Sequence, residues 1–308
     1  MRRRTRTVAF IVLVVVTAYA GYRLAYGTTD WGGVIAQWQE MGFWLFVVLL
    51  LAIADWTLEA ICWMWLYGRF QIPVRDRVGV SVYLAGHAGL FLPAQMGRII
   101  RPDAIVRLGR GGSVDALKAE AALLFLDTAA AVVVIGSLLF FWIQPLAIPV
   151  VALGLSLSML FLADRISSLL SRTRVSLPRD FWRGGQTLAM LWLIIVGWLL
   201  NGLAMYVLVR GLAAGISALE VIFFASLSRL LGSGTGLPGG IGVTEGLLGV
   251  SLQIMEIPLA HLLIAVVAYR VATFWVLLPL GWSGLLFVNR QVSKMRGPVE
   301  HELQVAAK

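Results

Sequence analysis

Apolar residues in this chain form long blocks separated by short polar stretches that are rich in arginine. A helix rises about 1.5 Å per residue, so roughly 17 or more apolar residues can cross the hydrocarbon core of a bilayer. Six blocks reach that length and are predicted to span: 8–26, 43–67, 119–143, 146–163, 187–209 and 259–288. This pattern predicts an all-α polytopic membrane protein.

Two further apolar stretches, residues 78–97 and 218–256, are interrupted by glycine and proline. Such positions break a regular helix. Within a membrane, irregular backbone is tolerated only where it is buried in protein or lines a water-filled cavity, because its polar groups need partners. Both interrupted stretches are therefore expected to lie beside a polar cavity.

The positive-inside rule decides how these two stretches are placed. If residues 78–97 crossed completely, the basic loop 98–118 would lie outside, against the rule. The stretch is therefore predicted to be a re-entrant hairpin that enters from the cytoplasm and turns near Pro93. The same reasoning predicts that residues 218–256 form a hairpin from the outer side, and that both chain termini are cytoplasmic. The apolar run after the basic N-terminus continues to Tyr26, which favours a retained anchor over a cleaved signal peptide.

An offset of 145 residues relates the two interrupted stretches. At this offset Gly89 matches Gly234, Leu92-Pro93 matches Leu237-Pro238, and Gly97 matches Gly242. The order of spans and hairpins also repeats, which predicts one membrane domain over 1–308 with inverted halves at 8–143 and 146–288 and a cytoplasmic tail at 289–308. Inverted repeats are typical of secondary transporters. The alternative is chance similarity between glycine-rich membrane segments.

Composition supports the membrane assignment and excludes several functions. Hydrophobic residues make up 59% of the 308 and charged residues only 13%, well below the charged share of soluble domains. The net charge of +9 lies mainly beside apolar segments, as attraction to anionic headgroups requires, so nucleic acid is not an expected partner. The single cysteine, Cys62, excludes an internal disulfide. No catalytic or metal-binding motif appears, so neither an enzyme, a metal nor a cofactor is predicted.

Arginines within or beside the apolar segments are the first candidates for function. Arg229 and Arg270 lie inside such segments, where a charge costs about 2.5–3.5 kcal/mol on insertion scales and needs a partner or a purpose. They are predicted to contact an anionic headgroup or to form internal ion pairs. Arg98 and Arg101 lie one helical turn apart and are predicted to receive a phosphate at the cytoplasmic mouth of the first hairpin. The alternative for this second pair is ordinary positive-inside charge.

Acidic residues and the helix breaks complete the predicted site. Asp55 and Glu59 are four residues apart and share a helix face; with Asp127 they are candidates for proton coupling, or for ion pairs with the membrane arginines. Glu245 is expected either to cap the half-helix after the second break or to line the cavity. The breaks predicted to line the cavity are Pro93, Gly97, Pro238, Gly239, Gly240 and Gly242.

Two motifs resemble those of a known family. Residues 237–246, LPGGIGVTEG, followed by Tyr269-Arg270 in a final span, resemble the lysylphosphatidylglycerol synthase transmembrane, or flippase-like, family. Residues 92–101, LPAQMGRIIR, are similar to the family's Pro-x-x-x-Gly-Glu-x-x-Arg segment. The sequence departs from the pattern at Arg98, where the family has Glu, and at Asp127-Thr128, where it has Glu-Arg early in the following span.

The resemblance implies a function in lipid movement at a bacterial inner membrane. In some members the membrane domain is fused to an aminoacyl transferase; no counterpart of that enzyme is present in this sequence, so lipid aminoacylation is not expected. The resemblance implies translocation of an anionic or polar-headed lipid, such as an anionic phospholipid, glycolipid, hopanoid or polyprenyl-linked lipid. The alternative is an accessory subunit that presents lipid to a glycosyltransferase or another enzyme of a lipid pathway.

Overall fold

The computed structural model describes residues 42–90, 92–169, 177, 180–212 and 215–306. All regular structure in these ranges is helical, which confirms the predicted all-α polytopic fold. Five helices of the described part are long and apolar enough to cross a membrane: Gly42–Arg69, Ser113–Trp142, Pro145–Leu169, Gly185–Gly211 and His261–Met295. Each contains most of one predicted span. The predicted first span, 8–26, lies outside the described residues.

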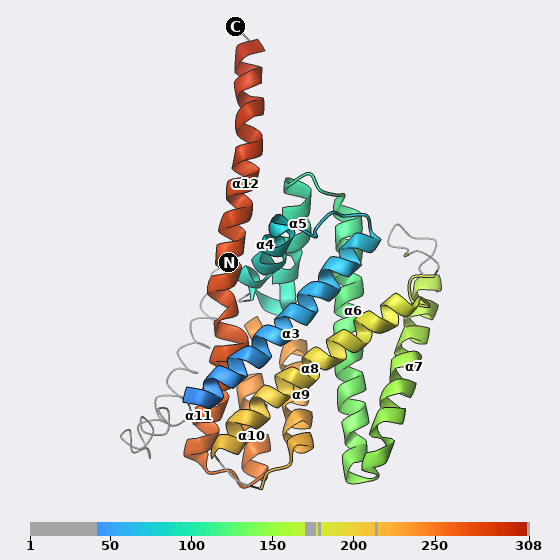
Figure 1. Ribbon diagram of the computed structural model, residues 1–308, viewed down its shortest axis with the longest axis vertical. Coiled ribbons are helices and arrows are strands. Elements are labelled where there is room, and N and C mark those ends of the chain that lie inside the picture. The colour runs from blue at the N-terminus through green and yellow to red at the C-terminus, as the bar shows by residue number, and fades with distance from the viewer. Residues whose placement is uncertain (1–41, 91, 170–176, 178–179, 213–214, 307–308) are drawn as a thin grey trace, which may run out of the picture.

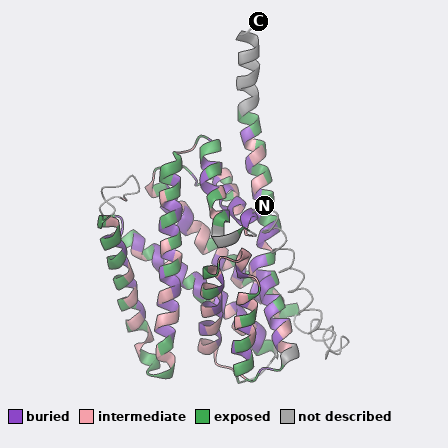
Figure 2. Ribbon diagram, turned by 180° about the vertical axis from the view of Figure 1, so that it is seen from behind, coloured by how far each residue is buried: buried purple, intermediate pink, exposed green. Residues whose placement is uncertain are grey.

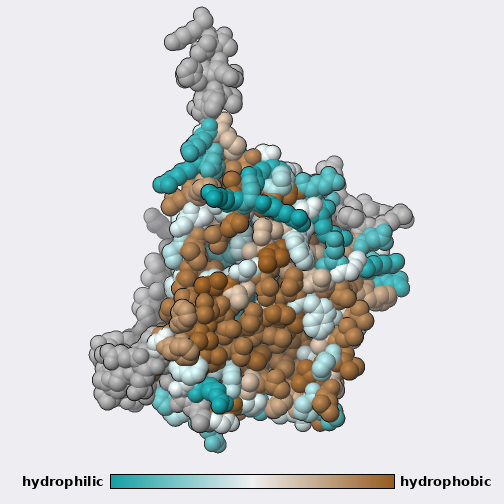
Figure 3. Space-filling model, in the orientation of Figure 1, coloured by the Kyte–Doolittle hydropathy of each residue, from teal (hydrophilic) through white to brown (hydrophobic). Residues whose placement is uncertain are grey.

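The spanning helices run between two ends of the molecule that differ in charge. In Figure 1, α3 (Gly42–Arg69) and α8 (Gly185–Leu212) lie side by side at a slant, while α6 (Ser113–Leu138) and α7 (Ile148–Leu169) stand together at one edge. A brown apolar band covers the face seen in Figure 3, and hydrophilic side chains gather at the end from which the last helix emerges. This end carries Arg69 at the end of α3, and Arg75 and Arg77 in the segment that follows, and we call it the basic end.

The first hairpin consists of four short elements between α3 and α6. They are α4 (Arg77–Ala85), the 3₁₀ turns Gly86–Gly89 and Pro93–Ile99, and α5 (Ile100–Arg107). With 9 and 8 residues, α4 and α5 are each only about 13 Å long, too short to cross a bilayer of about 30 Å. The two arms meet where an ideal Cβ on Gly97 would lie 2.6 Å from the carbonyl carbon of Gly89. Only a pair of glycines allows that approach.

The second hairpin follows α8 and approaches the first from the opposite end of the molecule (Figure 1). It comprises α9 (Ala218–Gly234), the 3₁₀ turn Pro238–Gly240 and α10 (Val243–Ile254). Gly239, Gly240 and Gly242 at its tip have φ of +59°, +65° and +86°, in the left-handed region that favours glycine. The tips of the two hairpins are in contact, through the turns Pro93–Ile99 and Pro238–Gly240.

Entry into the first hairpin is fixed by a carboxylate outside the spanning segments. Asp76 caps α4, accepting a hydrogen bond of 2.7 Å from the backbone N–H of Gly79. Both its oxygens also accept from Arg110, at 2.8 and 2.7 Å. Together with the N–H of Gly79, the Arg110 guanidinium holds the pKa of Asp76 below its ordinary value of 3.8. The start and the end of the hairpin are thereby tied together.

The last helical segment contains a π-helical turn. It runs through α11 (Leu259–Arg270), the π turn Val271–Trp275 and α12 (Leu277–Ala306). The sequence predicted a span ending at residue 288 and a cytoplasmic tail at 289–308; in the structure α12 continues as helix through Ala306, and the cytoplasmic side of the tail stays a prediction. The residues from Asn289 onward are polar, so the apolar span ends there. Residues 289–296 include no glycine or proline, so the helix itself continues.

The order of elements repeats across the chain. A long helix, a broken hairpin and a further long helix occur first as α3 to α6 and again as α8 to α12. The repeat boundaries, 8–143 and 146–288, stay a prediction, because the first helix of the first half is outside the described residues. Figure 2 shows buried residues along the inward faces of the helices and exposed ones along the outward faces, as expected where lipid covers the outside.

Candidate functional site

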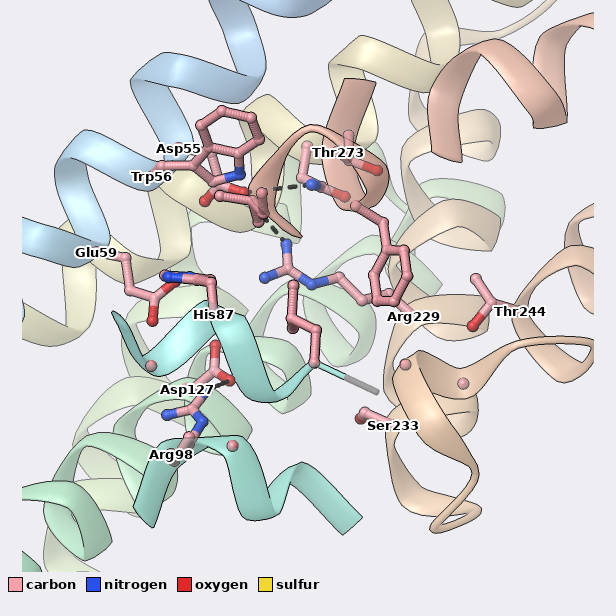
Figure 4. A pocket seen from close by; sticks show the side chains of 18 of the residues that line it. Asp55, Trp56, Glu59, His87, Arg98, Asp127, Arg229, Ser233, Thr244 and Thr273 are labelled. Carbon is pink, nitrogen blue, oxygen red and sulfur yellow. Dashed lines mark hydrogen bonds and ion pairs between the residues drawn. The ribbon is translucent and has the colours of Figure 1, made fainter. Parts of the chain in front are cut away.

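A cavity of about 210 Å³ lies where the two hairpin tips meet α3, α6, α8 and the π turn. Figure 4 shows charged side chains from these separate elements pointing into the same space. Its charged and strongly polar lining residues are Asp55, Glu59, His87, Arg98, Arg101, Asp127, Asn201, Arg229 and Arg270. Four arginines facing one cavity is an unusual concentration of positive charge for the interior of an apolar protein.

Arg229, on α9, is held by groups from α3 and α8. Its Nη1 lies 3.5 Å from Oδ2 of Asp55, and its guanidinium stacks over the Trp198 ring at 4.4 Å. Asp55 also accepts a hydrogen bond of 3.2 Å from Nδ2 of Asn201, whose Oδ1 accepts from the hydroxyl of Tyr269. One carboxylate thus joins α3 to the second hairpin.

Arg98, at the tip of the first hairpin, pairs with α6. Its Nη2 lies 2.9 Å from Oδ2 of Asp127, and the other oxygen of that carboxylate accepts from Nε1 of Trp198 at 2.9 Å. The second nitrogen of the guanidinium, Nη1, is buried and has no hydrogen-bond partner in the described part of the chain. A cavity-lining arginine therefore has an unused donor.

Arg101 is the most enclosed of the four, at 2% exposure. It lies 3.8 Å from Glu59 and 3.7 Å from Glu120, donates to the carbonyl of Tyr83 at 3.1 Å and stacks over that ring. Room for it comes from Gly86, where a Cβ would lie 2.3 Å from Nε of Arg101. The sequence predicted Arg101 at the cytoplasmic mouth of the first hairpin; in the structure it is buried and lines the cavity.

Glu120 is anchored by two further donors, Nε1 of Trp63 and the hydroxyl of Tyr67, each at 2.9 Å. Arg101 and Glu120 thereby fix the arms of the first hairpin to α3 and α6.

Arg270, at the end of α11, holds the tip of the second hairpin. Its Nε lies 2.6 Å from Oε1 of Glu245, and its Nη2 donates to the carbonyl of Gly239 at 2.9 Å. The other oxygen of Glu245 accepts from the backbone N–H of Gly242 at 2.6 Å. Glu245 therefore caps α10, the first of the two roles that the sequence left open, and pairs with Arg270; its own side chain does not line the cavity.

Most predicted site residues lie at this one cavity. Its lining includes the predicted residues Asp55, Glu59, Gly97, Arg98, Arg101, Asp127, Arg229, Gly239, Gly240 and Arg270. Glu245 contacts the site through Arg270, and Pro238 and Gly242 shape the tip behind it. The side chain of Pro93 is not described. Asp55 and Glu59 take different partners, Arg229 and Arg101, although they share one helix face.

Sequence reasoning missed Glu120, Trp198 and Asn201. Asn201 gave a usable signal, because it is an amide in the middle of an apolar span, where a polar group needs a partner. Glu120 lay at the edge of a basic loop and gave none. In the described part of the chain, no group of His, Cys, Asp and Glu side chains could hold a metal ion.

A family model described as the lysylphosphatidylglycerol synthase TM region matches residues 7–281. The chain belongs to this family. The matched range includes both hairpins and all four cavity arginines. Family membership and the apolar spanning helices show a multi-pass membrane protein with a lipid-related function. No curated protein matches the chain.

Proposed function

We propose that this protein moves an anionic or polar-headed lipid between the two leaflets of a bacterial inner membrane, with both termini in the cytoplasm. It does so as a transporter rather than as an enzyme. The proposal is supported by the family and by a polar cavity enclosed between two hairpins that approach from opposite ends. Binding sites at broken helices are a general feature of secondary transporters.

The observation that carries the proposal is the free Nη1 of Arg98. Burying a guanidinium nitrogen without a partner is costly, so its persistence at the cavity suggests that a ligand completes it. A phosphate oxygen suits it, because guanidinium groups bind phosphate through paired, charge-assisted hydrogen bonds. We assign Arg98 as the first contact of the lipid phosphate.

Ion-pair exchange would let the other arginines bind and release a charged headgroup. Arg229, Arg270 and Arg101 are each held by carboxylates. A phosphate that enters the cavity replaces a carboxylate on a guanidinium, and the carboxylate returns when the lipid leaves. The guanidinium charge then stays paired at every stage, and the displaced carboxylate is the group that must take up a proton. The carboxylates of Asp55, Glu59 and Asp127 each pair with a cavity arginine. Once displaced from that arginine, they are the groups that would couple transport to protons.

The π turn Val271–Trp275 suits a hinge between the two hairpins. Before the turn, α11 packs against α8 and α10; after it, α12 packs against α4 and the first hairpin tip. A Cβ on Gly281 would lie 2.3 Å from the backbone nitrogen of Ala88, so α12 is held closely to the first hairpin. Irregular helical turns often mark functional sites, and bending here would rock one hairpin against the other.

The lipid class follows from the charge of the site. Arginine guanidinium groups favour headgroups that bear phosphate, as in anionic phospholipids and polyprenyl-linked lipids; glycolipids and hopanoids with polar headgroups remain within the proposal. An accessory subunit that presents such a lipid to a glycosyltransferase is the alternative function. It would use the same headgroup contacts but would not need the hinge.

Leaflet exchange of labelled lipids in vesicles separates the two functions. The purified full chain is reconstituted with trace amounts of fluorescent phosphatidylglycerol, and the fraction accessible to an external quencher is followed over time. We expect faster exchange than in protein-free vesicles and a loss of that gain in Arg98→Gln. Arg210→Gln is the matched control, since Arg210 bonds to Tyr206 on its own helix and does not line the cavity.

Exchange equal to that of empty vesicles, across several anionic and polar-headed lipids, would contradict transport. Retained binding of the lipid in the same preparation would then support the accessory function. If Arg210→Gln reduced exchange as much as Arg98→Gln, the assignment of Arg98 would be wrong.

A further inference from the structure

A second hollow, of about 310 Å³, lies at the basic end, between the end of α3 and the start of α8. It shares no lining residue with the central cavity. We call it the rim hollow, and its lining residues are Trp65, Gly68, Arg69, Arg75, Gln186 and Met190. Its floor is apolar, because Met190 is fully buried, and its edge carries two guanidinium groups.

These two arginines differ from those of the central cavity in having no carboxylate partner among the described residues. Arg69 is fixed by neutral groups: its Nη1 donates to the carbonyl of Phe181 at 3.2 Å and to the hydroxyl of Thr187 at 2.5 Å. Its guanidinium also stacks over the Phe181 ring at 4.3 Å. A positive charge is therefore held in place without being neutralised.

Arg75 is exposed and forms no hydrogen bond or ion pair with any residue that the structure describes. The neighbouring Arg110 is different, because its charge is taken up by Asp76. Arg75 lies above Gly68, where a Cβ would be 3.7 Å from Nη2 of Arg75. Because Gly68 has no side chain, the space beneath the guanidinium of Arg75 is not filled and the hollow stays open.

An apolar track on α3 leads to the rim hollow. Phe46, Leu50 and Ile53 are 58%, 50% and 45% exposed, and their spacing of three to four residues places them on one helix face. The same face continues through Thr57 and Met64 to Gly68, where Trp65, which is 40% exposed, stands beside it in the hollow. Tryptophan is favoured at the boundary between hydrocarbon and headgroups. The track therefore ends at headgroup depth, beside the two arginines.

We infer that the rim hollow binds the phosphate of an anionic phospholipid from the adjoining leaflet, with an acyl chain along the α3 track. Two guanidinium groups without acids match a phosphodiester, the amide of Gln186 offers a further donor, and the apolar track explains why the ligand is a lipid. The site holds a resident lipid against the outside of the helix bundle. It does not depend on the transport proposed for the central cavity.

Lipid retention by the full chain in detergent, measured by native mass spectrometry during titration with phosphatidylglycerol, tests the site. Arg75→Gln should weaken the tightest binding about tenfold, as expected for losing a charge-assisted hydrogen bond. Gly68→Leu should weaken it similarly, because it fills the hollow and leaves both charges. Arg77→Gln is the control: it removes the same charge two residues away, outside the hollow, and should change binding less than about twofold.

Three outcomes would overturn the inference. Equal losses in Arg75→Gln and Arg77→Gln would mean diffuse attraction to the basic end. Unchanged binding in both Arg75→Gln and Gly68→Leu would remove the hollow as a site. Displacement of phosphatidylglycerol by millimolar inorganic phosphate would show a site for free phosphate. Each outcome is independent of leaflet exchange, which is measured separately.

Discussion

Nη2 of Arg98 lies 2.9 Å from Oδ2 of Asp127, so an ion pair connects the tip of the first hairpin to α6. Both residues stand at motif positions where the resemblance described above implies other residues. Here the base is on the hairpin and the acid is on the following helix.

Reversing the charges of this pair should show that the two positions depend on each other. Arg98→Asp or Asp127→Arg alone places like charges together inside the protein, and we expect each to lower the free energy of unfolding by about 3–5 kcal/mol. The double variant should recover more than half of the summed loss. Recovery should be incomplete, because Nε1 of Trp198 can donate to Asp127 but not to an arginine. Unfolding in detergent, followed across a denaturant series, measures all three variants.

A double variant that is as unstable as the sum of its single variants would contradict this dependence. Asp103→Arg provides the control for charge reversal itself, since the Asp103–Arg107 pair is largely exposed, at 3.5 Å on one helix. We expect less than about 1 kcal/mol there.

Hydropathy and charge were enough to predict the five spanning helices of the described part of the chain and the two broken hairpins. Both signals can be read from short stretches of sequence. A long apolar run spans the membrane, glycine and proline interrupt a helix, and arginine-rich loops stay on the cytoplasmic side. The positions of the breaks at Pro93 and Pro238 therefore followed from the sequence. The π turn after Arg270 did not, because its residues, Val271–Trp275, have the composition of an ordinary apolar helix.

The pairing of charges in the site could not be predicted. Asp55 and Arg229 are 174 residues apart, and the sequence offered Arg270 as an equal partner for Asp55. Packing decides between them: Trp198 and Asn201 place Arg229 beside Asp55, whereas the cap of α10 places Glu245 beside Arg270. Such choices depend on how helices far apart in sequence pack, which no local pattern records.

Arg270 should be needed for transport and not merely for folding. Arg270→Gln leaves Glu245 without a counter-charge, so a loss of stability is expected in that single variant. In Glu245→Gln with Arg270→Gln, both charges are gone and stability should largely return. We expect leaflet exchange to stay at least about tenfold slower in the double variant, as for the loss of one charge-assisted hydrogen bond to a headgroup. The same vesicle assay measures exchange, and thermal unfolding measures stability.

Glu245→Gln alone is the informative control, because it keeps the positive charge of Arg270. It should retain more exchange than the double variant. If the double variant transported as well as the unmodified protein, Arg270 would be a purely structural residue.

The close approach of Gly89 and Gly97 should make the first hairpin intolerant of a single added methyl group. A Cβ on Gly97 would lie 2.6 Å from both the carbonyl carbon and oxygen of Gly89, and backbone atoms cannot rotate away as a side chain could. Gly97→Ala should therefore cost about 1–3 kcal/mol of unfolding free energy. Gly154→Ala on α7 is the matched control, because its added Cβ would meet no atom within 4 Å beyond the adjoining turns of its own helix among the described residues.

In that control, alanine should be neutral or should stabilise by up to about 1 kcal/mol, since glycine lowers helix stability. Thermal midpoints of the two variants in the same detergent compare them directly. Equal midpoints would show that the hairpin arms can separate without cost.

Acid should remove the stability that Asp76 contributes at the entrance to the first hairpin. Its pKa in the folded protein is below the ordinary 3.8, chiefly through hydrogen bonds from Arg110. A lowered pKa means that the contribution is complete above the unfolded value and is lost as the pH falls through the folded value. Because the side chain is 47% exposed, solvent screening limits the contribution to about 1 kcal/mol.

The difference in thermal midpoint between the unmodified protein and Asp76→Asn should therefore be constant from pH 7 to pH 5 and should shrink below pH 4. Arg110→Gln, which removes the same ion pair but keeps the α4 cap, should show a smaller loss at pH 7. A difference that widens on acidification would contradict the lowered pKa, because it would require Asp76 to be more easily protonated in the folded protein than in the unfolded chain.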